Sequence, residues 1–424
     1  MSATIGYLDT LKRALKPALG CTEPLTVALA AAHARHHCPG ALLSMQICVS
    51  ANLFKNAAGV FVPGTGMTGL AIAAATGWFC GNSEAGLEVL AKLSPEGLDA
   101  AKQLIDKQQI TLNYIDHDDV FYTCLEVTTD QSKAKVVMGQ QHDGVLSIEV
   151  DGQCCYQDAS NRSAVCERVP AEGWSVRQIV EFITQVDLAE LHFIEQSATL
   201  NQALSDVGLT EKLGLAVGAS LYQQQQAGWL SDDLASRAMI LSASASDARM
   251  AGAPMAAMSN SGSGNQGIAA TMPVVAVAQI LQVSNEQRLR ALAMSHLLAV
   301  YIKKMQSPLS ALCAATTAAM GSAAAINWLL GGDVSQIEQT IRYMIGDISG
   351  IYCDGAKPGC ALKVSTGASA AVKAALLGLN GGSARSDGML ESSVDDSLRN
   401  LGELTWKPLQ ATDQQIVRWI AARQ

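Results

Sequence analysis

Three of the eleven cysteines lie in the C-terminal half of the chain, at positions that suit a metal centre. Cys313 stands in a run of small apolar residues, while Cys353 and Cys360 flank the turn Asp354-Gly-Ala-Lys-Pro-Gly359. The glycines and the proline of that turn allow both sulfurs to fold towards one point. Three thiolates are one short of the set that usually holds an iron–sulfur cluster, so one iron would stay open to an outside ligand, as catalytic metal sites require.

Spacing alone leaves other interpretations of these cysteines open. Cysteine often behaves as a small buried hydrophobe, and the alanine-rich surroundings of Cys313 suit that interpretation. Zinc is the competing metal for a set of thiolates, in which case the site would be structural. A redox sensor that carries a cluster without being an enzyme is a third alternative, although the chain has no basic helix-turn-helix region to act as its output.

Two further residues are candidates for acid–base chemistry. Cys21 lies in Ala18-Leu-Gly-Cys-Thr-Glu-Pro24, at a break between two expected helices, where a helix N-terminus would favour its thiolate. The alternative is a buried thiol with no chemical role. His142 stands at an expected hairpin turn, from which it could reach a site as a proton carrier.

A segment near residue 55 is a candidate for binding a small anion. Asn52, Lys55 and Asn56 precede the glycine turn Pro63-Gly-Thr-Gly66. Lys55 would supply a point charge and the turn would supply backbone N–H groups. A polar edge beside a tight turn is the alternative. The turn is not a Walker loop, because no Gly-Lys-Ser or Gly-Lys-Thr follows it.

A second polar segment, Ser259-Asn-Ser-Gly-Ser-Gly-Asn-Gln-Gly267, interrupts the longest uncharged stretch of the chain and opens an apolar helix. Such a loop at a buried helix N-terminus suits a carboxylate, whereas the alternative is a flexible loop. It does not match the dinucleotide pattern, since we expect neither a strand before it nor a βαβ unit around it. The candidate substrate-binding residues of this segment are Ser261, Gly262, Asn265 and Gln266.

These residues need strands and helices that bring distant segments together. Alternating residues predict a strand over 42–50, a strand that runs through 51–63 into the glycine turn, and several strands between 110 and 160. Leucines at four-residue spacing predict that residues 1–37 are helical around a break at Gly20. Further helices are expected over 67–76, 83–108, 175–186, 189–205, 209–226, 230–250, 267–282, 285–304, 310–330, 334–347 and 361–377, and residues 403–424 are expected to add a strand or a last helix.

The predicted fold class is therefore α+β and mainly α, with a helical bundle that carries the catalytic site and a small α/β portion with an antiparallel sheet near the N-terminus. We expect two domains. Residues 1–170 form the α/β domain with Cys21 and the Lys55 region, and residues 171–424 form the helical, cluster-binding catalytic domain.

Composition limits the partners. The net charge of −9 and the absence of a basic cluster argue against nucleic acid. Only 16% of the residues are charged, against about 25% in a typical chain, so we expect a large core and further burial in a homo-oligomer, with a dimer favoured. The two uncharged stretches, 250–285 and 305–332, are interrupted by glycine, serine and proline. They are expected to form buried helices rather than membrane spans.

The cellular compartment is expected to be the cytoplasm. The first ten residues contain an acidic residue and no apolar core, so they do not look like a signal peptide. An odd number of cysteines in a long chain does not suggest a secreted disulfide framework. A reducing compartment would leave the thiolates free to bind metal.

Four motifs together resemble the L-cysteine desulfidase family, which is related to the α chain of iron–sulfur L-serine dehydratases. The resemblance runs over nearly the whole chain, and the spacing of the three cysteines is its most specific part. The motifs are Gly20-Cys-Thr-Glu-Pro24, Lys55-Asn56 leading to Pro63-Gly-Thr65, Gly264-Asn-Gln-Gly267 and Cys353-Asp-Gly-Ala-Lys-Pro-Gly-Cys-Ala-Leu-Lys363.

The resemblance implies an oxygen-sensitive [4Fe–4S] cluster held by Cys313, Cys353 and Cys360. It implies conversion of L-cysteine to hydrogen sulfide, ammonia and pyruvate without pyridoxal phosphate, and a catalytic role for Cys21. Serine dehydratases space the second and third cysteines further apart, which favours the desulfidase branch. Dehydration of L-serine, or of another β-substituted amino acid, on the same cluster is the alternative.

These roles predict a β-elimination. The open iron would act as Lewis acid on the leaving sulfur, and Cys21 or His142 would remove the α-proton. Lys55 and the segment 261–266 would hold the carboxylate of a small amino-acid substrate.

Overall fold

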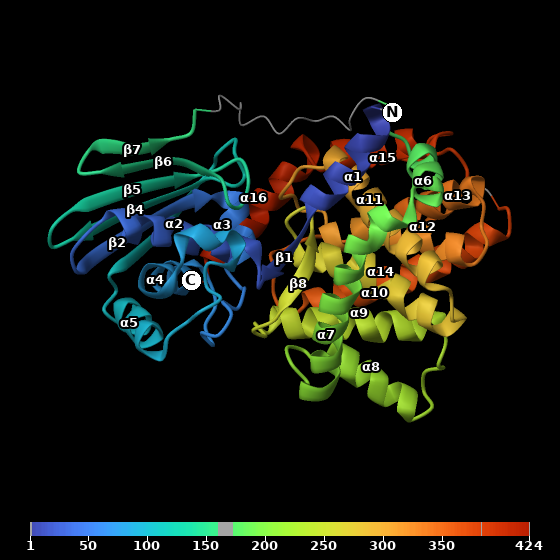
Figure 1. Ribbon diagram of the computed structural model, residues 1–424, viewed down its shortest axis with the longest axis horizontal. Helices are drawn as coiled ribbons and strands as arrows, with labels where there is room; N and C mark the ends of the chain where they lie inside the picture. Colours follow the sequence, from blue (N-terminus) through green and yellow to red (C-terminus); the bar gives the residue numbers. More distant parts are fainter. Residues whose placement is uncertain (1, 160–172, 383, 424) are drawn as a thin grey trace.

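The computed structural model describes residues 2–159, 173–382 and 384–423. Figure 1 shows two parts side by side: a sheet with its own helices at the left of the view, and a large helical bundle at the right. Strands β1 and β8 lie between them. The predicted fold class, mainly α with a smaller sheet portion, is confirmed.

The sheet part runs from the second helix to the seventh strand. Its elements are α2 (Thr22–His37), β2 (Leu42–Ser50), α3 (Ala51–Ala57), α4 (Leu70–Cys80), the 3₁₀ helix η1 (Ser83–Glu88), α5 (Pro95–Asp106), β3 (Ile110–Ile115), β4 (Thr123–Thr129), β5 (Lys133–Met138), β6 (Val145–Val150) and β7 (Gln153–Gln157).

The helical part comprises the first helix, the first strand and the elements that follow residue 172. Its elements are α1 (Ser2–Ala14), β1 (Leu15–Leu19), α6 (Val176–Gln185), the 3₁₀ helix η2 (Leu188–Ile194), α7 (Glu195–Glu211), α8 (Val217–Gln226), α9 (Leu234–Met250), β8 (Ala256–Asn260), α10 (Gly264–Leu281), α11 (Asn285–Met305), α12 (Ala314–Leu329), α13 (Val334–Ile348), α14 (Cys360–Leu379), α15 (Val394–Leu404) and α16 (Lys407–Ala421).

The larger sheet has the strand order β3-β2-β4-β5-β6-β7. All neighbours are antiparallel except β2 and β3, which run parallel with Met45 beside Ile110. The sheet is thus mixed rather than purely antiparallel, because the helices between β2 and β3 provide the crossover that a parallel pair needs. Helix α2 covers β4 and β5, burying Leu125 and Val136.

Each of the two parts has its own hydrophobic core. The N-terminal helix packs in the core of the helical part, although the sheet part follows it in sequence, and the C-terminal helix packs in the core of the sheet part. Tyr7 and Leu11 of α1 pack in the core of the helical part, whereas Val417 of α16 packs in the core of the sheet part. Both terminal helices therefore tie the two cores together. The predicted domain boundary between residues 170 and 171 lies outside the described residues.

Residues 15–19, predicted to continue the first helix, form β1 instead. Pro17 lacks an N–H group and disfavours a helical conformation at the residue before it, so α1 ends at Ala14. Strand β1 pairs antiparallel with β8, which leads into the polar segment 259–267 and includes its first two residues, although no strand was expected there. The chain then turns at Gly20, where φ is +80°, and an added Cβ would lie 2.5 Å from Pro63.

Residues 51–57 were predicted to extend a strand, and they form the short helix α3. Ser50 accepts a hydrogen bond from the Leu53 backbone at 3.2 Å and so caps this helix. The glycine turn follows as expected, with φ of +73° at Gly64 and +69° at Gly66. Residues 403–424 were expected to add a strand or a last helix, and the structure shows a helix over Lys407–Ala421.

Small residues allow the central helices to approach closely. An added Cβ at Gly321 of α12 would lie 2.3 Å from the Ser295 carbonyl oxygen of α11. Within the described chain, α14 alone is long and apolar enough to cross a membrane by length and composition, and 56% of its apolar window is buried. It packs against α9, α12 and α13, as expected of a buried helix.

His296 of α11 is fully buried and lies in a hydrogen-bond network. The Asn260 side-chain amide donates to Nδ1 at 3.1 Å, and Nε2 lies 2.9 Å from the Thr271 hydroxyl. That hydroxyl donates to the Gly267 carbonyl at 2.7 Å. The network therefore requires a neutral ring with its proton on Nε2. Burial lowers the pKa of His296 to about 3.

We expect the free energy of unfolding to fall as the pH drops below about 6.5. The folded pKa of His296 lies below the ordinary value of 6.5, so the unfolded chain takes up the proton first. The stabilisation is complete above 6.5 and is lost as the pH falls towards 3. Urea unfolding at several pH values between about 7.5 and 5 measures how steeply the free energy of unfolding changes with pH. The variant His296→Gln should be less stable at neutral pH but show a flatter slope, and an unchanged slope would contradict this assignment.

Candidate active site

A cavity of about 110 Å³ lies where the sheet part meets the helical part. The N-terminal ends of α2, α10, α12 and α14 all reach its wall, at Thr22, Ser263, Cys313 and Cys360. Helix N-termini carry a partial positive charge and unsatisfied N–H groups. The cavity is therefore suited to thiolates and to other small anions.

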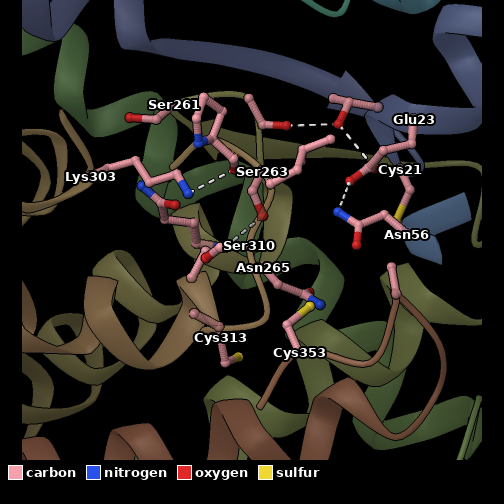
Figure 2. Close-up of a pocket in the computed structure, with 18 of the residues that line it drawn as sticks. Cys21, Glu23, Asn56, Ser261, Ser263, Asn265, Lys303, Ser310, Cys313 and Cys353 are labelled. Atoms are coloured by element: carbon pink, nitrogen blue, oxygen red, sulfur yellow. Dashed lines mark hydrogen bonds between the residues drawn. The ribbon is translucent and has the colours of Figure 1, made fainter. Parts of the chain in front are cut away.

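Cys313 and Cys353 are held side by side although 40 positions separate them in the chain. The Cys313 backbone N–H donates to the Ile351 carbonyl at 3.0 Å, and the Cys353 N–H donates to the Ala311 carbonyl at 2.6 Å. These two bonds form a short antiparallel bridge before α12. The bridge places both thiols on the cavity wall, where Figure 2 shows them on the same side.

Cys360 reaches the same cavity as the first residue of α14. The turn before it rests on the end of α3, where the Ala356 N–H donates to the Asn56 carbonyl at 3.1 Å. Gly355 has φ of +97°, and an added Cβ would lie 2.3 Å from the Lys55 carbonyl oxygen. Only glycine allows this approach. The three predicted ligands thus line one cavity.

The same turn is fixed by a charge cluster. Asp354 accepts hydrogen bonds from the ammonium groups of Lys357 and Lys363, and Lys363 also donates to the Tyr352 carbonyl at 2.7 Å. Burial opposes ionisation of Asp354, but the two lysines outweigh it and hold its pKa at about 2. The carboxylate therefore remains charged, which keeps the turn in place at ordinary pH.

The thiols of Cys313 and Cys360 resist ionisation in the absence of a positive group. Burial, followed by the neighbouring Cys353 and Cys313, raises the pKa of Cys360 to about 12. Burial and Cys353 also raise the pKa of Cys313. Three thiolates would repel one another here unless a cationic centre lay between them.

Cys21 is the N-cap residue of α2 and lines the cavity, but its side chain makes no capping hydrogen bond. Burial raises its pKa to about 11, and the Arg249 guanidinium opposes this only in part. The expected favouring of the thiolate by the helix N-terminus is therefore outweighed by desolvation. The thiol is protonated at neutral pH.

His142 lies on the cavity wall in the turn between β5 and β6. Its Nε2 is 3.2 Å from the Thr22 hydroxyl, which donates to the Gly262 carbonyl at 2.8 Å. Burial lowers the pKa of His142, and the Glu23 carboxylate opposes this only in part. The ring is neutral at pH 7 and can accept a proton.

The predicted residues near position 55 separate into two groups. Asn56 lines the cavity and donates to Glu23 at 3.1 Å. Lys55 is fully buried, its ammonium is paired with Asp413 of α16, and it does not line the cavity. Asn52 donates to the Leu309 carbonyl at 2.7 Å and likewise lies outside the cavity wall. The expected role of Lys55 as substrate cation does not fit this position, because a carboxylate of the chain already neutralises it.

The predicted segment 261–266 does line the cavity. Ser261 and Gly262 have φ of +49° and +82°, and Gln266 donates to Asn260 at 2.9 Å. Asn265 accepts a hydrogen bond from Ser246 at 3.1 Å. The segment therefore forms a hydrogen-bonded loop at the start of α10.

Several cavity residues were missed from the sequence, among them one carboxylate, two cations and a serine. Glu23 follows Cys21 by two positions, so the motif itself was a signal. Arg249 is the last charge before the long uncharged stretch, which was a weaker signal. Lys303 and Ser310 gave no signal in the sequence, because they reach the cavity wall only through the packing of α11 against the loop before α12. These residues are Glu23, Arg249, Lys303 and Ser310.

Comparison with known proteins supplies the family. A relative from Aeromonas hydrophila subsp. hydrophila, named "UPF0597 protein", is 49% identical over 421 residues, covering 99% of this chain and 96% of its own. Proteins of the same name from Aeromonas salmonicida and Shewanella pealeana are 48% and 46% identical and cover nearly all of both chains. A sequence model of the serine dehydratase alpha chain matches residues 84–418. The predicted kinship is confirmed, and the chain belongs to the serine dehydratase alpha chain family.

Proposed function

We propose that this protein is an iron–sulfur-dependent lyase that converts L-cysteine to hydrogen sulfide, ammonia and pyruvate. The family is one of lyase-type enzymes, and the choice of L-cysteine and of the cluster goes beyond it. The observation that carries the proposal is the presence of Cys313, Cys353 and Cys360 on the wall of a single cavity that four helix N-termini approach.

The residues of the cavity fit a cluster better than a single ion. Among the described residues, no three histidine, cysteine, aspartate or glutamate side chains are placed to hold one metal ion. In a [4Fe–4S] cluster each cysteine binds a different iron, which allows wider spacing of the sulfurs. Soft thiolates suit iron–sulfur clusters, and the buried thiols of Cys313 and Cys360, whose pKa values are raised, call for a cationic centre to hold them as thiolates.

Cys313, Cys353 and Cys360 would hold the cluster. Its chemistry, when bound through three cysteines, is that of a Lewis acid with one iron open to the substrate's β-substituent. The remaining task for the chain is to position a small amino acid and to remove its α-proton.

His142 is the better base of the two predicted candidates. Its neutral ring can take the proton from the α-carbon, whereas the Cys21 thiol is itself protonated at neutral pH. The electrons of the Cα–H bond then form the Cα=Cβ bond, and the Cβ–S pair leaves with the sulfur. The resulting aminoacrylate tautomerises, and water releases ammonia and pyruvate. The Thr22 hydroxyl lies 3.2 Å from His142 Nε2 and 3.3 Å from a Glu23 carboxylate oxygen, so it can pass a proton between these two groups.

L-Serine is the second candidate substrate, and the match to serine dehydratase alpha chain favours it. The same elimination would then release water in place of hydrogen sulfide. The two substrates differ in one atom, and an open iron held among sulfur ligands would favour the thiolate leaving group.

Anaerobic purification and reconstitution with iron and sulfide test the proposal. We expect close to four irons and four sulfides per chain, and faster formation of pyruvate from L-cysteine than from L-serine. Faster turnover of L-serine would select the dehydratase instead. A fully loaded protein that releases pyruvate from neither amino acid would refute the lyase and favour the redox sensor.

A further inference from the structure

Arg249 is a buried cation on the wall of the cavity. It lies one residue before the end of α9 and is 5% exposed. Its guanidinium has five N–H donors. One terminal nitrogen, Nη2, donates to the Gly20 carbonyl at 3.0 Å, and the other, Nη1, donates to the Met250 sulfur at 3.4 Å. Its Nε has no hydrogen-bond partner among the described residues, and the guanidinium also lies beside the Cys21 thiol.

No carboxylate of the described chain forms an ion pair with Arg249. Among the described cavity residues, Glu23 supplies the carboxylate, and it already accepts hydrogen bonds from Asn56 and Thr22. Leaving a buried guanidinium without an anion is costly. Arg249 therefore differs from Lys55, whose buried charge Asp413 neutralises.

The surroundings of Arg249 are those of an anion site. An added Cβ at Gly264 would lie 2.1 Å from the Arg249 Nε, so the guanidinium rests directly against the first turn of α10. A cation beside a positive helix end is unfavourable by itself. The side-chain amide of Asn265 donates at 3.3 Å to the same Met250 sulfur as Arg249 does. Thioether sulfur is a weak acceptor, so two strong donors converge without a strong acceptor between them.

We propose that Arg249, together with Asn265 and the first turn of α10, binds the α-carboxylate of the amino-acid substrate. A planar guanidinium and a carboxylate form a two-bond pair, which fixes the orientation of the ligand as well as its charge. This inference replaces Lys55 as the anchoring cation, and it takes the identity of the substrate from the proposed function. It predicts that ligands without a carboxylate bind to the cavity more weakly than ligands that have one.

A purely structural role for Arg249 makes a different prediction. Its bond to the Gly20 carbonyl could serve only to hold the turn before α2 in place. Loss of the side chain would then weaken every ligand alike, or destabilise the fold, without changing the preference between ligands. The test must therefore measure a ratio of affinities.

The probes are 3-mercaptopropionate, which has a thiol and a carboxylate, and 2-aminoethanethiol, which has a thiol and no carboxylate. Anaerobic calorimetry on the reconstituted protein should show at least about tenfold tighter binding of the first. In Arg249→Met this ratio should fall to about one, and Arg249→Lys, which keeps the charge but loses the fork, should lie between. Iron content and thermal unfolding confirm that each variant is folded and loaded.

Arg342 provides a matched control. It is also buried, at 4% exposed, and its Nε also has no hydrogen-bond partner in the described part of the chain, but it lies on α13 away from the cavity. The variant Arg342→Met should keep the wild-type ratio even if it lowers stability. An unchanged ratio in Arg249→Met, or no preference for 3-mercaptopropionate in the wild type, would overturn the inference. An Arg249-dependent preference in a protein that releases no pyruvate would instead sustain the inference and refute the lyase.

Discussion

Serine in place of Cys353 is expected to lower the iron content of the reconstituted protein well below four per chain and to reduce pyruvate formation by about a hundredfold or more. Serine has nearly the same shape as cysteine, but its hydroxyl is a poor ligand for iron in a cluster. Cys353 is half-buried, so the hydroxyl can be solvated and the fold should survive. Iron and sulfide analysis, the visible spectrum and the rate with L-cysteine measure the effect.

Cys80 gives the matched control for this prediction. It is also half-buried and free, but it ends α4 in the sheet part and does not line the cavity. The variant Cys80→Ser should retain iron, spectrum and rate. If Cys353→Ser binds a full cluster with unchanged turnover, the proposed ligand set is wrong. If both variants lose iron equally, the loss reflects general instability, and Cys353 has no special role.

Removal of the Asp413 carboxylate is expected to lower the free energy of unfolding by about 3–5 kcal/mol, because it leaves a buried ammonium unpaired. The side chain of Lys55 is 0% exposed and that of Asp413 is 9% exposed. Asp413 also accepts a hydrogen bond from the Ala311 N–H at 3.0 Å, and the Ala311 carbonyl accepts the N–H of Cys353. Asp413→Ala should therefore lose iron as well as stability, as urea unfolding and iron analysis would show.

An exposed ion pair supplies the control for Asp413→Ala. The side chains of Lys12 and Glu190 are 47% and 52% exposed, so Glu190→Ala should cost under about 1 kcal/mol. The double variant Lys55→Met/Asp413→Leu removes both charges and should recover much of the lost stability. Its iron affinity should stay low, because Ala311 still lacks its acceptor. Equal stability of Asp413→Ala and Glu190→Ala would show that the buried pair contributes little.

The elements that the sequence predicted well are those whose pattern is local. Strand 42–50 was predicted with the bounds that the structure shows, because apolar residues alternate there beside a clear break. Most helices of the C-terminal half were likewise predicted from a local periodicity, but the break expected at 206–208 lies at 212–216. Residues 15–19 were predicted wrongly, since their leucine spacing suits a helix while Pro17 and the partner strand β8 decide otherwise. A strand partner 240 residues away leaves no local trace.

The candidate site shows the same division. The types of Cys313, Cys353, Cys360, Cys21 and His142 were enough to single them out, because thiols and imidazole are chemically distinctive wherever they lie. Lys55 was chosen on its charge, and its pairing with Asp413 depends on a helix at the opposite end of the chain. Burial likewise decided the protonation of Cys21 against the expected effect of the helix end.

The sequence by itself determined which chemistry the protein can draw on: a set of thiols, one imidazole and a polar loop at a helix start, within a mainly helical chain of low charge. The tertiary structure alone decided which cations are free to meet a substrate. It neutralised Lys55 and left Arg249 in the cavity without a carboxylate partner among the described residues. The physical reason is that the energy of a buried charge depends on its neighbours in space, and those neighbours come from helices far apart in the chain.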